Sequence, residues 1–154
     1  MIINEYKTEL NNKGQTVLAK EKSYNYDGDA LNEPKSIVGM MNTVFRMNKK
    51  AEEYVYMLAV NKKMKILGMF EVSHGSVDAS VCGPREIYLR ALLCGASQVV
   101  AIHNHPSGDC SPSNEDMKVT KRIREAGNII GLHLIDHIII GGETYYSFRE
   151  EGIL

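Results

Sequence analysis

The sequence predicts an α/β protein, of the α+β kind, in which helices flank a mixed β-sheet. Short runs rich in β-branched and other apolar residues alternate with segments whose apolar residues recur at helical spacing. Such an alternation implies a sheet with helices packed on it. The chain has 154 residues, 44% of them hydrophobic and 24% charged. This is the composition of an ordinary soluble domain that can bury a core without disulfides.

The first 26 residues are expected to form two short polar strands, joined by a turn at Gly14 in NNKGQ. They carry few large apolar side chains, so this segment is either an edge hairpin or a partly mobile arm. The turn signal YDGD at residues 26–29 marks the expected boundary. We therefore divide the chain into an N-terminal arm or edge hairpin, residues 1–30, and a single globular domain, residues 31–154.

Past this boundary, the pattern predicts a helix followed by two strands. The helix starts near Pro34, because proline is tolerated at the first helical position. Its apolar face comprises Ile37, Val38, Met41, Val44 and Phe45. The nearly continuous apolar run EYVYMLAV, residues 53–60, is typical of a central strand. The turn NKK then leads into a second strand, residues 64–73.

The second half of the chain continues the alternation of helix and strand. Residues 82–97 are expected to be helical, because Pro84 lies near the first turn and Gly95 near the end. The remaining elements are a strand over 98–105 ended by Pro106, a helix over 113–126 closed by Gly127, and strands over 131–142 and 144–148.

Bulk composition argues against several classes of protein. The net charge of −1 gives no electrostatic indication of nucleic-acid or membrane binding. Cys82, Cys94 and Cys110 form no C-x-x-C pair, which argues against a disulfide framework and favours a reducing cytoplasm. The N-terminus lacks the pattern of a signal peptide, and no apolar run approaches the roughly 20 residues of a membrane span. We expect a cytoplasmic protein without a membrane partner.

The stretch IHNHPSGDCSPSNED, residues 102–116, combines residues that can bind a metal ion. His103 and His105 are two apart at the end of a strand, so both side chains point to the same face. Asp116 falls in the first turn of the following helix, where the helix dipole favours an ionised carboxylate. Two neutral imidazoles and a carboxylate form the ligand set of an open, catalytic zinc site, with the fourth position left to water.

Each part of this stretch also has an ordinary structural interpretation. Ser113 and Asp116 match the Ser-x-x-Asp capping box, which is far commoner than any metal site. Two histidines at a strand end can simply be solvated. The combination of H-x-H, a loop with Pro106 and Gly108, and Ser-x-x-Asp is much more specific than its parts. It predicts a metal site on a strand-to-helix connection.

The same stretch resembles a known family. HNHPSGDCSPSNED fits the H-x-H-x7-S-x2-D signature of the JAMM (MPN+) metalloproteases, and HNHPSGD is similar to their bacterial RadC-like branch. VCGPREIYLRALLCGASQVVAIHNHPSGD and LIDHIIIGG resemble further blocks of that branch. The resemblance covers about residues 35 to 150. It implies the JAB/MPN fold, which is cytidine deaminase-like, for residues 31–154.

The resemblance implies roles for five residues. His103, His105 and Asp116 would be ligands of Zn²⁺, and Ser113 would stabilise an oxyanion beside it. The family's glutamate general base comes from an earlier strand, and Glu71 in MFEVSHGS is the matching residue. Solvation at an exposed strand end would equally explain a charge in this apolar strand. The implied chemistry is attack of a zinc-activated water on an amide carbonyl, with Glu71 as the proton carrier.

Other polar residues near these motifs are not expected to bind the metal. His133 and His137 are four apart in an expected strand, which separates them by about 13 Å at roughly 3.3 Å per residue. Asp136 and His137 match the D-H pair of the resembling family, for which we expect a structural or supporting role. His74 is expected to be a loop histidine. Cys110 borders the site, where a thiolate would close the fourth zinc position, but loop geometry favours another direction.

Three functions follow from these patterns. The first is a zinc metallopeptidase or isopeptidase that acts on a peptide or isopeptide substrate. The second is a DNA-repair accessory factor, which only the tradition of the RadC-like family suggests. The third is a non-catalytic, zinc-stabilised interaction module. The complete five-residue set favours the enzyme, because a structural module has no use for a general base. The residues leave open the substrate and whether the chain forms a homodimer.

Overall fold

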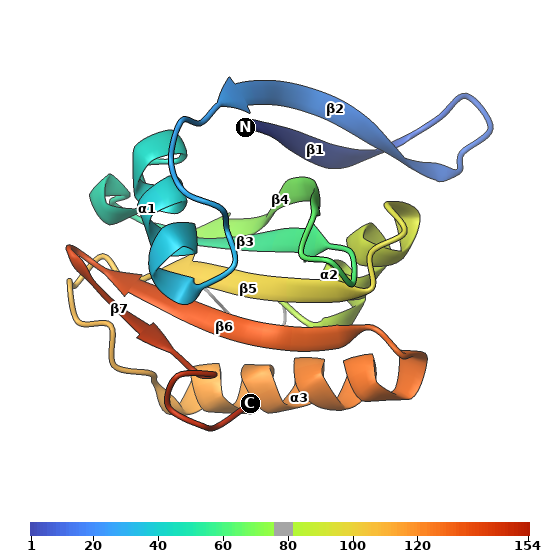
Figure 1. Cartoon of the computed structure of the whole chain (residues 1–154). Coiled ribbons are helices and arrows are strands. Elements are labelled where there is room, and N and C mark those ends of the chain that lie inside the picture. Colours follow the sequence, from blue (N-terminus) through green and yellow to red (C-terminus); the bar gives the residue numbers. More distant parts are fainter. Residues whose placement is uncertain (76–81) are drawn as a thin grey trace.

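The structure, a computed structural model, describes residues 1–75 and 82–154. Within them, seven strands form one sheet in the order β2-β1-β4-β3-β5-β6-β7 (Figure 1). The strands are β1 (Ile2–Leu10), β2 (Thr16–Asn25), β3 (Glu53–Val60), β4 (Ile66–Gly75), β5 (Gln98–Asn104), β6 (His133–Gly141) and β7 (Thr144–Ser147). The helices are α1 (Pro34–Val44), α2 (Pro84–Leu93) and α3 (Asn114–Ile130), with a short 3-10 helix, η1 (Met47–Lys49). None of the helices described here is long and apolar enough to cross a membrane.

The sheet is mixed, because β1 and β4 as well as β5 and β6 are parallel, whereas the other neighbouring strands are antiparallel. Helices pack on it, and Figure 1 shows α3 running alongside β6. This architecture confirms the predicted fold class.

Strand β3 lies between β4 and β5, and its apolar run is continuous because both of its faces are buried. Tyr56 and Leu58 enter the core that α1 covers, which we call the α1 face of the sheet. Val55 and Met57 enter the core that α2 and α3 cover, which we call the α2/α3 face. Because strand residues alternate between faces, the side of the sheet on which a site residue lies follows from its strand partner.

The N-terminal residues form an antiparallel hairpin of β1 and β2 at one edge of the sheet (Figure 1). Gly14 lies in the turn, with φ of 71°. Strand β1 joins the sheet by parallel pairing with β4, where Glu5 lies opposite Met69. Ile3 is fully buried on the α1 face. These N-terminal residues are therefore part of the sheet.

Helix α3 does not end at Gly127, as predicted, but continues to Ile130. Its C-cap is Gly131, whose φ of 70° gives the left-handed conformation typical of a terminating glycine. Gly127 has a different role, because a Cβ at this position would clash with the Tyr88 hydroxyl and the carbonyl oxygen of Leu132. The missing side chain lets α2 approach α3.

Other elements also differ from their predicted bounds, and β5, β6 and β7 do so by one or two residues at an end. Strand β4 spans Ile66–Gly75 and not residues 64–73, because Met64 has a φ of 59° and belongs to the preceding turn. His74 is therefore a strand residue and not the loop histidine that was expected. Helix α2 ends at Leu93 and not at residue 97, and Gly95 with φ of 69° follows its end. The short helix η1 was not predicted.

Candidate metal centre

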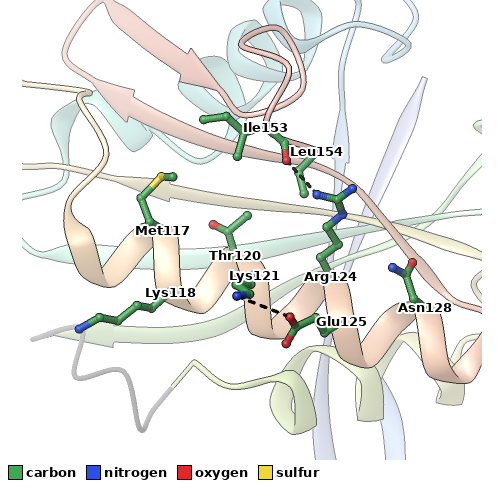
Figure 2. Close-up of a pocket in the computed structure, with 9 residues that line it drawn as sticks. All are labelled: Met117, Lys118, Thr120, Lys121, Arg124, Glu125, Asn128, Ile153 and Leu154. Carbon is green, nitrogen blue, oxygen red and sulfur yellow. Dashed lines mark hydrogen bonds and ion pairs between the residues drawn. The ribbon is translucent and has the colours of Figure 1, made fainter.

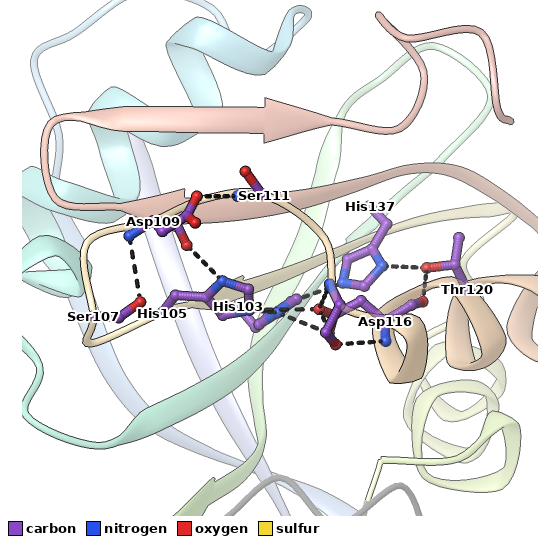
Figure 3. Close-up of polar contacts among 9 residues, drawn as sticks. His103, His105, Ser107, Asp109, Ser111, Asp116, Thr120 and His137 are labelled. Atoms are coloured by element: carbon purple, nitrogen blue, oxygen red, sulfur yellow. Dashed lines mark hydrogen bonds and ion pairs between the residues drawn. The ribbon is translucent and has the colours of Figure 1, made fainter.

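The predicted metal-binding stretch lies where β5 ends and α3 begins (Figure 3). His103 is the penultimate residue of β5, and β5 runs between β3 and β6. His105 follows the strand, and its backbone N–H still donates to the Ile140 carbonyl at 2.9 Å. Asp116 lies in the first turn of α3. The strand end and the helix start therefore bring the three side chains together.

The three predicted ligands face one another closely. His103 Nε2 lies 3.0 Å from His105 Nε2 and 3.2 Å from Asp116 Oδ1, and His105 Nε2 lies 3.5 Å from Asp116 Oδ2. Ligands about 2.0–2.1 Å from a tetrahedral zinc ion are about 3.3 Å apart, so this donor set fits the ion. No other group of His, Cys, Asp and Glu with such spacing occurs among residues 1–75 and 82–154.

The protonation of His105 is set by the loop that follows it. Gly108, with φ of 85°, turns the chain, and its N–H donates to the His105 carbonyl at 3.1 Å. The carbonyl oxygen of Asp109 then lies 2.7 Å from His105 Nδ1 (Figure 3). A carbonyl only accepts, so the proton is on Nδ1. This leaves a lone pair on Nε2, which faces the other two ligands.

Asp116 is both a helix cap and a member of the cluster. The Ser113 backbone N–H donates to Asp116 Oδ2 at 2.7 Å, the Ser113 hydroxyl donates to the same oxygen at 2.6 Å, and the Asp116 N–H donates to Ser113 Oγ at 3.1 Å. The capping box and the metal site are therefore compatible.

The electrostatics of the cluster keep this carboxylate ionised. Burial would raise the pKa of Asp116, but its interactions with His103 and His105 in their protonated, charged form, together with the hydrogen bond from Ser113, outweigh burial and hold this pKa far below its usual range. The pKa of His105 is raised, chiefly by its hydrogen bond to Asp116, against the effect of burial. The Asp109 carbonyl and the Glu53 carboxylate add to this rise.

A pocket of about 330 Å³ opens beside the cluster, and Glu53 is one of the residues that line it. Its lining comprises Glu53, Cys82, His105, Ser107, Ser113, Glu115, Asp116 and Val119. Glu53 begins β3, two residues before Val55, which pairs with His103. It therefore lies on the same face of the sheet as His103. In the sequence, the only indication of a role for Glu53 is that an acidic residue begins the predicted central strand. The pairing of β3 with β5 is what places Glu53 near the histidines.

The structure places Glu71 away from the cluster. Glu71 pairs with Tyr56, whose hydroxyl donates to Glu71 Oε2 at 3.1 Å, and Tyr56 belongs to the α1 face. The second carboxylate oxygen lies 2.8 Å from His74 Nδ1. Glu71 therefore lies on the opposite face from His103, and its assignment as general base has to be corrected.

The reason is a bulge in β4. Val55 pairs with Ser73, but Tyr56 pairs with Glu71, so Val72 is an additional residue in β4. In a strand without this bulge, Glu71 would pair with Met57 and lie on the α2/α3 face. A shift of one residue moves every later side chain of a strand to the other face.

Cys110 is directed away from the three ligands. Its Sγ lies 3.5 Å from the hydroxyl oxygen of Thr144 at the start of β7. The loop packs tightly on the end of β6, since a Cβ at Gly141 would come within 2.6 Å of both the Cys110 nitrogen and the Gly108 carbonyl oxygen. This packing holds the thiol beside β7.

His133, Asp136 and His137 do not belong to the cluster of candidate ligands. His133 is exposed, and its Nδ1 is 3.3 Å from Asn128 Oδ1. Asp136 is buried and accepts from the Ser147 hydroxyl at 2.7 Å and the Arg149 N–H at 3.0 Å, which is a structural role. His137 is buried, and burial lowers the pKa of its imidazole well below the ordinary value.

A larger pocket, of about 610 Å³, lies between α3 and the C-terminal residues (Figure 2). Its charged side chains have partners within the chain. Lys121 Nζ lies 3.9 Å from Glu125 Oε1, and the Arg124 guanidinium donates to the Ile153 carbonyl at 2.9 Å. The three candidate ligands found in the described residues are not in its lining. The smaller pocket is therefore the candidate site.

The mixed sheet is consistent with a JAB-like fold, and it presents H-x-H at a strand end and Ser-x-x-Asp at the start of the next helix. The chain belongs to the family described as the RadC-like JAB domain, whose model matches residues 31–153.

Curated relatives agree with this family. A UPF0758 protein of Clostridium acetobutylicum is 39% identical over 134 residues, which are 86% of this chain and 58% of the relative. A UPF0758 protein of Alkaliphilus metalliredigens is 38% identical over 124 residues, which are 80% of this chain and 53% of the relative. One of Pelobacter propionicus is 44% identical over 102 residues, which are 66% of this chain and 44% of the relative. The chain thus spans about half the length of the curated relatives it matches.

Proposed function

We propose that this chain is a zinc-dependent hydrolase of amide bonds, either a metallopeptidase or an isopeptidase. The observation that carries the proposal is the convergence of His103, His105 and Asp116 beside a pocket that Glu53 also lines. A purely structural zinc site is normally closed by four protein ligands, whereas a catalytic site keeps one position open. Three ligands beside a pocket correspond to the catalytic type.

The ligand set suits zinc. Two imidazole nitrogens and one carboxylate oxygen are ligands that Zn²⁺ accepts, and the metal would be held by His103 Nε2, His105 Nε2 and Asp116. When bound, zinc lowers the pKa of a coordinated water and polarises a carbonyl group.

Glu53 is the general base of the proposed reaction, in place of Glu71. Its carboxylate takes a proton from the attacking water and returns it to the leaving amine, which completes the cleavage of the amide bond. Its position at the start of β3 supports this role, because β3 is packed on both faces and pairs with β5 from Val55, two residues after Glu53.

Ser113 contributes in two ways. Its hydroxyl donates to Asp116 Oδ2 and so orients this ligand. The side chain also lines the pocket. Rotation about the Cβ–Oγ bond would turn the same proton toward a substrate oxygen that gains negative charge, as an oxyanion donor does.

The test compares the wild-type protein with two variants, Glu53→Gln and Glu71→Gln, each of which replaces a carboxylate by an amide of the same size. Each is assayed for bound zinc and for turnover of a library of peptides and isopeptides. We expect all three proteins to hold one zinc per chain. Cleavage should fall by about 10²–10⁴-fold in Glu53→Gln, the usual contribution of a general base, and persist in Glu71→Gln. Stoichiometric zinc without any Glu53-dependent cleavage would instead identify a zinc-stabilised interaction module.

A further inference from the structure

A buried chain of hydrogen bonds leads from the candidate metal centre into the interface between α3 and β6 (Figure 3). His103 Nδ1 lies 2.9 Å from His137 Nε2. His137 Nδ1 lies 2.6 Å from the hydroxyl oxygen of Thr120, and this hydroxyl lies 2.6 Å from the backbone carbonyl oxygen of Asp116. His103, His137 and Thr120 are all buried. His103 and Asp116 are predicted ligands, whereas His137 and Thr120 have no role in the proposed reaction.

The direction of every bond in this chain is determined at one end. The Asp116 carbonyl oxygen can only accept, so the single hydroxyl proton of Thr120 is donated to it. The Thr120 oxygen therefore accepts from His137, and the proton of His137 is on Nδ1. His137 Nε2 then carries a lone pair, which accepts from His103. The proton of a neutral His103 is consequently on Nδ1, and its Nε2 lone pair faces His105 and Asp116.

The opposite tautomer of His103 has a stabilising partner of its own. A proton on His103 Nε2 would point toward Asp116 Oδ1, 3.2 Å away. An ionised carboxylate is a strong acceptor, so without an opposing influence this proton would occupy the position of the metal. His105 has a backbone carbonyl that fixes its tautomer, but His103 depends on another side chain.

We propose that Thr120 and His137 are positioning residues, which keep the proton of His103 on Nδ1 and so present its Nε2 lone pair to the metal. The proposal rests on the metal site of the proposed function, and it adds two residues that touch neither the metal nor the substrate. It also explains why a histidine is buried in the middle of an apolar strand. Only an imidazole has a donor and an acceptor nitrogen on opposite sides of one ring, as this chain of bonds requires.

Substitution of Thr120 separates this role from packing. Thr120→Val keeps the size and the β-branch but removes the hydroxyl, so His137 Nδ1 loses its acceptor. His137 is then free to move its proton to Nε2, and His103 becomes the acceptor. Thr120→Ser keeps the hydroxyl and loses only a methyl group, so it is the matched control. His137→Leu, which removes the acceptor of His103 directly, is the second variant.

The first measurement uses the metal-free protein, with ¹⁵N-labelled histidine and long-range ¹H–¹⁵N NMR spectra that distinguish protonated from unprotonated ring nitrogens. At a pH where His103 is neutral, we expect it to be the Nδ1–H tautomer in the wild type and in Thr120→Ser. Thr120→Val should show a substantial fraction of the Nε2–H tautomer. An unchanged tautomer of His103 in both Thr120→Val and His137→Leu would overturn the proposal.

The second measurement is zinc affinity, determined by competition with a chelator. Loss of a residue that orients a metal-bound histidine typically weakens binding about 10–100-fold. We expect a loss of this size in Thr120→Val and His137→Leu, and less than about threefold in Thr120→Ser. Wild-type affinity in both of the first two variants would also contradict the proposal. The proposed zinc site and the proposed positioning role can fail separately. A wild-type protein that binds no zinc would refute the zinc site, whereas the NMR spectra of the metal-free protein would still test the positioning role.

Discussion

The hydroxyl of Ser113 donates a 2.6 Å hydrogen bond to Asp116 Oδ2, and the backbone N–H of Asp116 donates back to Ser113 Oγ at 3.1 Å. The same pair therefore begins helix α3 and orients a carboxylate between two imidazoles. One local interaction contributes both to stability and to the site, so its removal should affect two independent measurements.

The first prediction concerns Ser113→Ala. Loss of an N-cap hydroxyl typically costs about 1 kcal/mol of folding free energy, and the variant should show this loss in urea unfolding of the metal-free protein. Zinc affinity should fall as well, because Asp116 loses a hydrogen bond that orients it. Ser113→Thr retains a hydroxyl and should recover most of both. Equal stability of the alanine variant and the wild type would show that the hydroxyl does not cap the helix.

The second prediction concerns the metal ligands. His103→Ala and Asp116→Ala should each abolish stoichiometric zinc, measured by elemental analysis of the purified protein. His133→Ala is the matched control, since it removes a histidine from an exposed position at the start of β6. It should leave the zinc content unchanged. A full complement of zinc in both ligand variants would exclude the site.

The third prediction concerns Cys110→Ser. The thiol lies beside Thr144 and not beside the three ligands, so the variant should bind zinc with wild-type affinity. Substitution of Zn²⁺ by Co²⁺ provides a second measurement, because a thiolate ligand gives a charge-transfer absorption band in the near ultraviolet. We expect identical Co²⁺ spectra for wild type and variant. A band that only the wild type shows would place Cys110 on the metal.

The fourth prediction concerns acid stability of the metal-free protein. The pKa of Asp116 in the folded state lies below its ordinary value of 3.8. Below that value the unfolded chain binds a proton that the folded chain does not, so stability is present above it and is lost as pH falls. The free energy of unfolding of wild type should therefore decrease more steeply between about pH 4 and pH 2 than that of Asp116→Asn. Parallel curves would contradict this ionisation.

The fifth prediction concerns Gly127→Ala. A methyl group at this position clashes with the Tyr88 hydroxyl and with the Leu132 carbonyl oxygen. We expect a loss of about 1–3 kcal/mol of folding free energy, the usual cost of overpacking, although alanine favours helix. Asn128→Ala, at the next and exposed position of α3, should change stability by less than about 0.5 kcal/mol. Urea unfolding of both variants decides between a packing role and a terminating role for Gly127.

The sequence predicted the cluster of candidate ligands because its members are close in the chain. His103, His105 and Asp116 belong to one strand, one loop and one helix turn, whose geometry follows from strand alternation and helix capping alone. Glu53 is fifty residues before His103, and its place in the pocket depends on the pairing of β3 with β5. No local pattern contains that information.

The error for Glu71 has a physical cause that a single sequence does not reveal. The strand around it was correctly identified, but the bulge at Val72 reverses the face of the sheet to which Glu71 points. The end of α3 was missed for a related reason. Glycine is a residue type that often ends a helix. At position 127, however, it is required by packing, because a Cβ there would clash with Tyr88, which lies in another helix.

The tight contact of the 105–110 loop with Gly141 has a consequence for how the proposed metal site would be filled. The loop rests on the backbone of β6, and the backbone of His103 is held in the interior of a sheet with apolar cores on both sides. The candidate ligands are thus assembled by folding itself. Loading and removal of the proposed zinc ion would be reversible events on a folded protein, so we expect a chelator to strip the site without unfolding the chain.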